Sequence, residues 1–86
     1  MKVLYFAWLK TKTGVGEEEV SPPAGVDTVA ELAVWLSERS PGHAEALADL
    51  DVVRCAVDHD YAQPGDSIGG AREVAFFPPV TGGLGR

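Results

Sequence analysis

The residues best suited to chemistry are two adjacent glycines near the end of the chain, Gly82 and Gly83. They follow Pro78 and Pro79, which donate no ladder hydrogen bond and favour an extended exit from a strand. The four residues after Pro79 can reach about 13 Å at full extension. Paired glycines have the least hindered backbone, so they can enter a channel in which a Cβ would clash. The chemistry would be that of a terminal glycine carboxylate, which a partner must activate, for instance as an acyl-adenylate. The alternative is that the glycines belong to a frayed terminus without a chemical role.

The other candidates for chemistry each have a simpler explanation. Cys55 lies in the middle of an apolar stretch, where a cysteine usually packs as a small hydrophobe. His43 and His59 have no Cys or second His at ligand spacing, so we predict no metal site. Asp58 and Asp60 flank His59 in a stretch typical of a turn. From these residues the folded part of the chain is not predicted to be an enzyme on its own, nor to bind a cofactor.

Length and charge narrow the classes of partner. A chain of 86 residues forms one domain, with roughly 63% of its surface buried on folding. Seven basic and thirteen acidic residues give a net charge of −6, which disfavours binding to nucleic acid or to an anionic membrane. One cysteine cannot form an internal disulfide, and the longest apolar run, residues 3–9, is far shorter than the ~20 residues of a membrane span. We therefore expect a cytoplasmic protein.

The elements that must position the glycines form a β-rich pattern with one main helix. Strands are predicted at 2–10, 17–21, 52–57, 61–62 and 73–77. Thr28 and Glu31 match a capping box, so the main helix should begin at Val29 and run to Arg39. Residues 43–50 could add a further helical turn or two. This order predicts an α+β chain with a mixed sheet of four to five strands, a domain over residues 1–79 and a flexible tail over 80–86.

Two strands are apolar on both faces, although a single helix can cover only one face of a sheet. We assign one set of residues to the core: Val3, Tyr5, Ala7, Leu9, Val53, Cys55, Val57, Val74 and Phe76. The other set would form an apolar patch for a partner, centred on Phe6, Trp8, Ala75 and Phe77. The alternative is that loops or the segment after His43 cover this second face. The three glutamates at 17–19 are predicted to lie on a solvated edge strand.

The sequence resembles the small subunits of molybdopterin synthase, a family of ubiquitin-like sulfur carriers. The resemblance rests mainly on the C-terminal stretch, and more weakly on three other segments: residues 73–83 (EVAFFPPVTGG), 2–7 (KVLYFA), 28–29 (TV) and 56–58 (AVD), where the family commonly has Asn in place of Asp58. It covers essentially the whole chain up to Gly83. It implies the β-grasp (ubiquitin-like) fold.

The family resemblance also implies a function and a set of partners. An adenylating enzyme of the ubiquitin-activating type would use ATP and Mg²⁺ to activate the carboxylate of Gly83, and a sulfur donor protein would convert it to a thiocarboxylate. The tail would then enter the large subunit of a heterotetrameric molybdopterin synthase and give its sulfur to cyclic pyranopterin monophosphate. Gly82 would be the slender residue before the reacting one. The partner-binding residues would be these: Phe77, Phe6, Trp8, Ala75, Pro78, Pro79, Val80 and Thr81.

The chain departs from the family at its end, where Leu84, Gly85 and Arg86 follow the second glycine. A carboxyl group held in the peptide bond between Gly83 and Leu84 cannot be adenylated. The three residues would have to be removed, unless they are an added remnant or the chain is inactive as it stands. Other functions stay open: a sulfur carrier for thiamine, cysteine or transfer-RNA thiolation, a protein modifier conjugated through Gly83, or a β-grasp interaction module.

Overall fold

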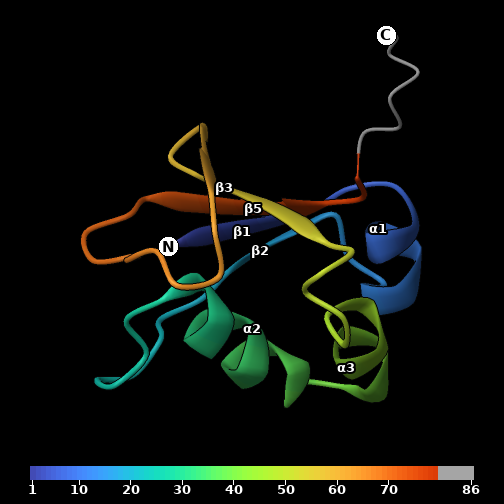
Figure 1. Cartoon of the computed structure of the whole chain (residues 1–86). Coiled ribbons are helices and arrows are strands. Elements are labelled where there is room, and N and C mark those ends of the chain that lie inside the picture. Colours follow the sequence, from blue (N-terminus) through green and yellow to red (C-terminus); the bar gives the residue numbers. More distant parts are fainter. Residues whose placement is uncertain (80–86) are drawn as a thin grey trace, which may run out of the picture.

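The computed structural model describes residues 1–79; the predicted tail, residues 80–86, lies outside the described part. Five strands form a single sheet, and three helices cover one face and one end of it (Figure 1). In chain order the elements are β1 Lys2–Tyr5, α1 Trp8–Thr13, β2 Glu17–Glu19, α2 Val29–Ser37, α3 Pro41–Ala46, β3 Arg54–Val57, β4 Asp60–Ala62 and β5 Glu73–Phe77.

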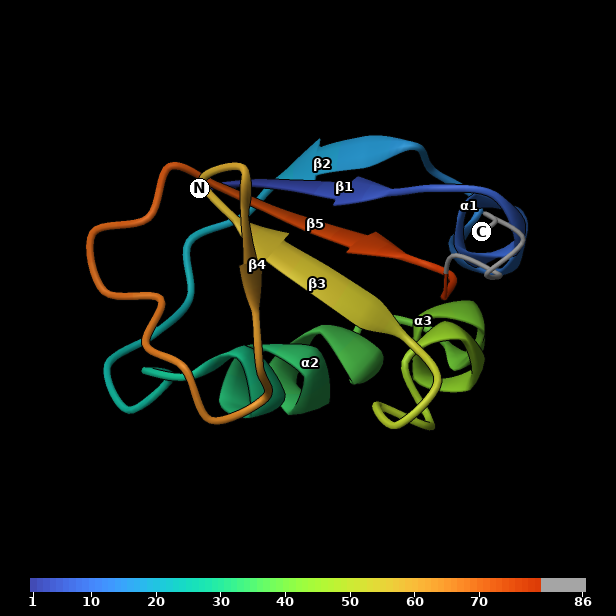
Figure 2. The same cartoon turned by 45° about the horizontal axis from the view of Figure 1, so that its top comes forward.

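The strand order across the sheet is β2-β1-β5-β3-β4 (Figure 2). The first and last strands, β1 and β5, are parallel neighbours in the centre, and every other pair is antiparallel. The helix α2 packs across one face, and no helix within residues 1–79 covers the other face of the sheet (Figures 1 and 2). This is the mixed five-stranded sheet of a β-grasp fold, and the predicted α+β class is confirmed.

The first predicted strand is wrong beyond Tyr5. The chain turns at Ala7, whose φ of 56° and ψ of −132° lie in a region that normally requires glycine. The N–H of Leu9 donates to the carbonyl oxygen of Phe6 at 3.1 Å and closes this turn. Trp8 therefore begins the helix α1 instead of continuing β1, and Gly14 ends that helix in a left-handed conformation with φ 85°.

The predicted core is largely confirmed. Seven of its nine residues are buried, namely Val3, Tyr5, Leu9, Val53, Cys55, Val74 and Phe76. The helix α2 adds Val29, Leu32, Ala33 and Leu36 from the face predicted by its spacing. Two assignments differ: Val57 is half-buried, and Ala7 is exposed because it lies at the turn after β1.

The helices on the covered face are capped as their sequences direct. The Thr28 hydroxyl accepts from the N–H of Glu31 at 3.2 Å, while the Glu31 carboxylate accepts from the N–H of Thr28 at 3.0 Å, which confirms the capping box. The helix ends at Ser37, two residues earlier than predicted. The helical turns predicted within residues 43–50 are present as α3, which begins earlier, at Pro41, and ends at Ala46. This helix lies against α1 so closely that a Cβ on Gly42 would be 2.0 Å from the carbonyl oxygen of Lys12.

The edge strand β2 has one inward-facing glutamate. Glu17 and Glu19 are exposed as predicted, but the Glu18 side chain accepts hydrogen bonds on one oxygen from the Tyr5 hydroxyl at 2.7 Å and from Nε2 of His43 at 2.9 Å. Arg39 donates to its other oxygen at 3.1 Å. Burial raises the pKa of Glu18, but these hydrogen bonds and the charge of Arg39 outweigh it, so the net pKa lies below the usual value. This cluster ties β2 to the helical layer.

The turn between β3 and β4 is fixed by Asp58. Asp58 and His59 have φ values of 48° and 77°, which the two central positions of a type I′ hairpin turn require. The Asp58 carboxylate accepts from the N–H groups of Arg72 and Glu73 at 2.9 and 3.0 Å, and so holds the start of β5. The predicted turn is confirmed, and both roles suit Asn as well as Asp.

Candidate protein-docking surface

The side chain of Phe77, the last residue of β5, points to the sheet face that the helices leave open, because Val74 and Phe76 point into the core. Phe77 is the last residue of that strand, and the chain then rises away from the helices through Pro78 and Pro79 (Figure 1). Pro78 is half-buried and Pro79 is exposed. We call this side of the sheet the outer face, and its residues at the Phe77 end are Leu4, Phe6, Arg54, Ala56, Tyr61, Ala75 and Phe77. Pro78 and Pro79, which precede the predicted tail, therefore follow directly after an outer-face residue.

Strand register brings the outer-face residues into two rows. In one row Ala75 lies between Leu4 of β1 and Ala56 of β3, and Tyr61 lies opposite Ala56. In the other row Phe77 lies opposite Arg54. Phe6 follows β1 beside Phe77, because its N–H donates to the carbonyl oxygen of Phe76 at 3.1 Å. The predicted contribution of Phe6, Ala75 and Phe77 to one surface is consistent with this register.

Aromatic side chains dominate the second row and its border. The ring of Tyr61 lies 5.9 Å from the ring of Phe77, and the two planes are tilted by 40°. Tyr61 is 80% exposed and Phe6 is 48% exposed, so large apolar groups stand open to solvent on a protein of this size. Aromatic residues in this setting are typical of a protein–protein interface.

Trp8 is not part of the sheet surface. It lies at the start of α1, beyond the end of β1, and is 38% exposed. The remaining predicted site residues, Val80, Thr81, Gly82 and Gly83, lie outside the described part of the chain.

Sequence reasoning missed Tyr61 and Arg54 as surface residues of this site. Tyr61 was predicted to lie in a short strand, and the alternation along that strand was a signal for its outward direction. Arg54 alternates with Val53 and Cys55, which both point into the core. The same period-2 pattern therefore placed Arg54 on the outer face.

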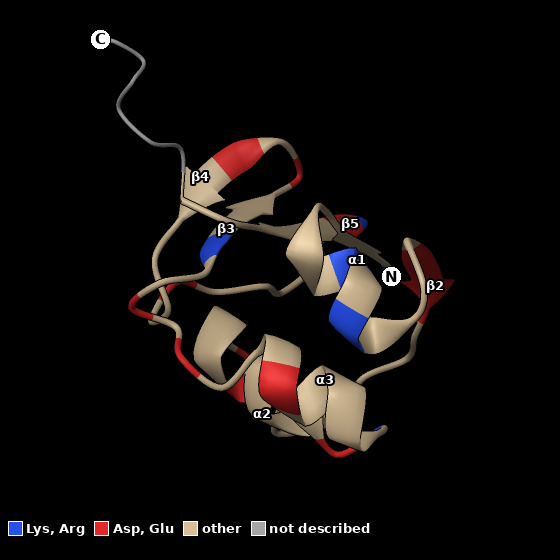
Figure 3. Cartoon of the chain, turned by 90° about the vertical axis from the view of Figure 1, so that its right-hand side faces the viewer, with Lys and Arg blue, Asp and Glu red and all other residues tan. Residues whose placement is uncertain are grey.

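A hollow of about 300 Å³ lies beside the ring of Phe77 on this surface. Its lining consists of Arg54, Cys55, Tyr61, Ala62, Gln63 and Phe77. The charges of the described residues are unevenly placed: Figure 3 shows basic segments on α1 and β3, and acidic segments on β2, β4 and α3. Lys12 of α1 pairs with Glu45 of α3.

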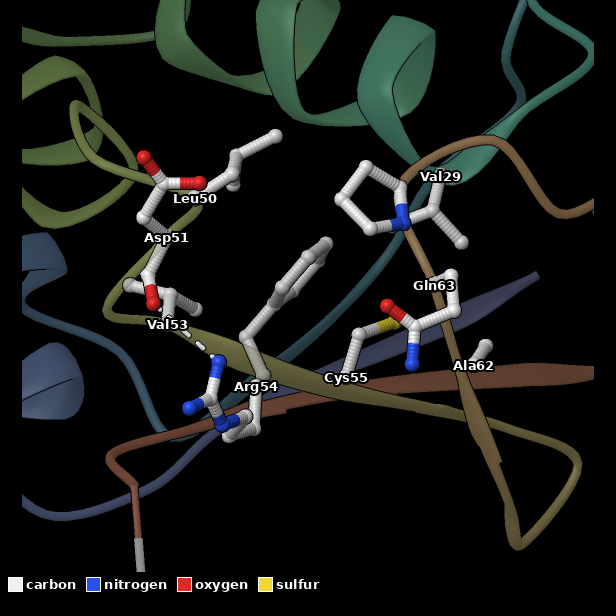
Figure 4. Close-up of a pocket in the computed structure, with 10 residues that line it drawn as sticks. Val29, Leu50, Asp51, Val53, Arg54, Cys55, Ala62 and Gln63 are labelled. Atoms are coloured by element: carbon white, nitrogen blue, oxygen red, sulfur yellow. Dashed lines mark hydrogen bonds between the residues drawn. The ribbon is translucent and has the colours of Figure 1, made fainter.

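Cys55 contributes packing and no nucleophile to the site. Its thiol borders a second cavity of about 360 Å³ between the sheet and the start of α2, where Figure 4 shows it beside Gln63 and near Val29. Burial, with a smaller contribution from the charge of Asp66, raises the pKa of Cys55 to about 12. The thiol therefore stays protonated near neutral pH, as expected of a core cysteine. His43 is likewise held inside the Glu18 cluster.

Comparison with known proteins decides the family. The model of the ThiS family matches residues 3–83, which is nearly the whole chain and includes both glycines. The chain belongs to the ThiS family. Residues 84–86 lie beyond the part that matches this family. None of the helices within residues 1–79 has the length and apolar character needed to cross a membrane.

Relatives of this ThiS-family chain have closely similar lengths. It is 38% identical over 86 residues to the molybdopterin synthase sulfur carrier subunit of Caenorhabditis briggsae, covering 96% of both chains. It is 36% identical over 83 residues to the subunit of that name from Escherichia coli (strain K12), covering 96% of this chain and 99% of the relative. These matches confirm the family resemblance seen in the sequence.

Solved structures confirm the fold of the ThiS-family chain. SAMP1 from Haloferax volcanii superimposes with a TM-score of 0.75 at 24% identity, covering 94% of this chain and 96% of that one. A molybdopterin converting factor, subunit 1, from Pyrococcus furiosus superimposes with a TM-score of 0.70 at 30% identity, covering 92% and 95%.

Proposed function

We propose that this ThiS-family chain is the sulfur carrier subunit of a molybdopterin synthase and that Gly83 is its reacting residue. The relatives that carry this name match it over almost their whole length, which supports the sulfur carrier role. The single structural observation that carries the proposal is the position of Phe77, which ends β5 on an open aromatic surface and precedes the two glycines closely in the sequence.

In the first step the carboxylate oxygen of Gly83 attacks the α-phosphorus of ATP, and pyrophosphate leaves. A sulfur nucleophile then attacks the acyl carbon and displaces AMP, so that one oxygen of the carboxylate is replaced by sulfur. ATP and Mg²⁺ are bound by the adenylating enzyme, and this chain supplies only the carboxylate and a slender approach through Gly82. Inside the large subunit the thiocarboxylate sulfur then bonds to a carbon of cyclic pyranopterin monophosphate and displaces an oxygen there. Water hydrolyses the resulting thioester, so the sulfur stays on the pterin and the carboxylate of Gly83 is restored.

The outer face is the proposed docking surface for both the adenylating enzyme and the large subunit. Phe6, Phe77 and Tyr61 offer a partner apolar area that no helix of the described chain covers. Burying aromatic groups of this kind is a major source of affinity in protein interfaces. One surface for two partners means that they bind in turn, so the tail is loaded before it is used. We place both steps in the cytoplasm, and the transfer of sulfur within a heterotetramer of small and large subunits.

Intact-mass measurement tests the proposal. A chain ending at Gly83 is incubated with the adenylating enzyme of the same organism, ATP, Mg²⁺ and sulfide, and a gain of about 16 Da is expected because sulfur replaces oxygen. Omission of ATP is the matched control and should abolish the gain. Ladders of modified proteins would indicate a conjugated modifier instead. An unchanged mass would indicate an interaction module without sulfur chemistry.

A further inference from the structure

Arg54 places a positive charge beside the aromatic centre of the outer face. It is exposed, begins β3 and lies directly opposite Phe77. One donor, Nη1, bonds to the main-chain oxygen of Asp51 at 3.1 Å (Figure 4). Within residues 1–79 no carboxylate lies within 4.0 Å of this guanidinium, whereas Arg39 and Lys12 both have an acidic partner. Arg54 is therefore held in position with most of its donors unused.

The surroundings of Arg54 suit one incoming side chain. The hollow of about 300 Å³ next to it has apolar walls from Phe77, Tyr61 and Ala62. Arg54 is the one charged residue in that lining, and Gln63 adds a neutral polar group. The chain as a whole carries a net charge of −6, whereas the charge that lines this hollow is positive. A partner attracted only by the net charge would present basic residues, and those would be repelled here.

We propose that this hollow receives the carboxylate of an Asp or Glu side chain from the large subunit that docks on the outer face. The planar guanidinium presents paired N–H donors that match the two oxygens of a carboxylate. Docking would exclude water from the walls formed by Phe77 and Tyr61, which strengthens the ion pair. The hollow adjoins the aromatic rows already assigned to docking, so the acidic side chain would fix the register of the partner on this face. The inference rests on the proposed function.

Affinity measured at two salt concentrations tests the role of Arg54. The full chain and its variants are titrated with recombinant large subunit of the same organism by calorimetry at 50 and 500 mM NaCl. Arg54→Gln is expected to weaken binding about tenfold at 50 mM and to reduce the salt dependence, because salt screens the attraction between the guanidinium and the carboxylate while both are still solvated on the separate proteins. Arg54→Lys should recover part of the loss. Arg72→Gln removes the same charge from an exposed arginine near the opposite end of β5, and it should bind like the wild type.

Each outcome separates this inference from the proposed function. If Phe77→Ala weakens binding and Arg54→Gln does not, the docking surface stands and the acidic contact is wrong. If Arg54→Gln weakens binding equally at both salt concentrations and lowers the melting temperature, its role is structural and the inference fails. If neither variant changes affinity, the large subunit binds elsewhere and both ideas fall. A loss that is confined to low salt, with an unchanged melting curve, is the result that supports the acidic contact.

Discussion

The rings of Tyr61 and Phe77 lie 5.9 Å apart on the open face of the sheet, with Tyr61 on the edge strand β4 and Phe77 at the end of β5. Phe77 is half-buried, and it lines the hollow that opens on this face. The pair joins the predicted docking surface to the end of β5.

Phe77→Ala is therefore expected to weaken binding to the large subunit by about 30-fold, which corresponds to the ~2 kcal/mol cost of truncating a central interface aromatic. The melting temperature should change little. Phe76→Ala is the matched control: that ring is 0% exposed, and its removal should lower the free energy of unfolding by ~3–5 kcal/mol. Calorimetric titration and thermal melts of both variants measure this. Wild-type affinity for Phe77→Ala with a collapsed melt would mean that the two sheet faces are reversed.

A chain ending at Gly83 should be adenylated, and the chain of 86 residues should not. Adenylation needs a free carboxylate on the residue that fits the channel of the partner, and in the longer chain that carboxylate belongs to Arg86. Pyrophosphate release by the adenylating enzyme on the two chains measures the difference. Equal rates would show that Gly83 is not the reacting residue.

Gly42→Ala should lower the free energy of unfolding by at least ~1–3 kcal/mol, since the new Cβ would lie 2.0 Å from the Lys12 carbonyl oxygen and force α3 away from α1. Gly65→Ala, where a Cβ would have open space, is the control and should stay within ~0.5 kcal/mol of the wild type. Urea unfolding of the two variants gives both values. A Gly42→Ala chain of wild-type stability would contradict the close approach of these helices.

The Cys55 thiol should resist alkylation in the folded chain. With its pKa raised to about 12 by burial and by Asp66, the thiolate is a minute fraction at pH 8. We expect iodoacetamide to react at least ~100-fold more slowly than with a free thiol. The chain has one cysteine, so mass spectrometry gives a direct reading, and addition of urea should restore the ordinary rate. Rapid labelling without urea would show that β3 opens to solvent.

Acid should destabilise the fold in part through Glu18. Burial raises the pKa of Glu18, but the hydrogen bonds from Tyr5 and His43 and the charge of Arg39 lower it by more. The pKa of Glu18 in the folded chain therefore lies below its pKa in the unfolded chain. The unfolded chain then binds the proton more readily, and the stabilisation is complete above about pH 4.5 and is lost as the pH falls through the folded pKa. Urea unfolding at pH 7, 5 and 3 should show a smaller acid loss for Glu18→Gln than for the wild type. Glu17→Gln, exposed in the same strand, should keep the wild-type profile, and identical profiles for all three would contradict the cluster.

The strand β5 and the start of α2 were predictable because local chemistry decides them. Pro78 ends β5 because it has no N–H to donate, whatever the tertiary contacts of the strand. The capping box at Thr28 and Glu31 likewise starts α2 through local hydrogen bonds that do not depend on the core. The helix α1 was not predictable in this way, since a continuous apolar run from 3 to 9 fits a strand and a helix equally well. The turn that separates β1 from α1 uses Ala7 where glycine is the usual residue, so no glycine marked it. Gly14 after Lys10 and Lys12 was the available signal of a helix end.

The place of Phe6, Ala75 and Phe77 on the outer face was predictable, because alternation along two strands is a local property. Arg54 and Tyr61 join it through the pairing of β3 with β5 and β4, and this pairing depends on residues distant in sequence. The inward turn of Glu18 needed His43 and Arg39 to be brought close by α2 and α3, a juxtaposition that no local pattern contains.

The parallel pairing of β1 with β5 also has a consequence for biosynthesis. The two central strands of the sheet are the first and the last to be translated, so the middle of the sheet cannot form until β5 has emerged from the ribosome. A chain whose translation stops before residue 73 lacks both the centre of its sheet and the segment leading to the glycines. Such truncated chains should therefore stay unfolded and be degraded. They should not fold into carriers that lack the glycines and compete with complete chains for the activating enzyme.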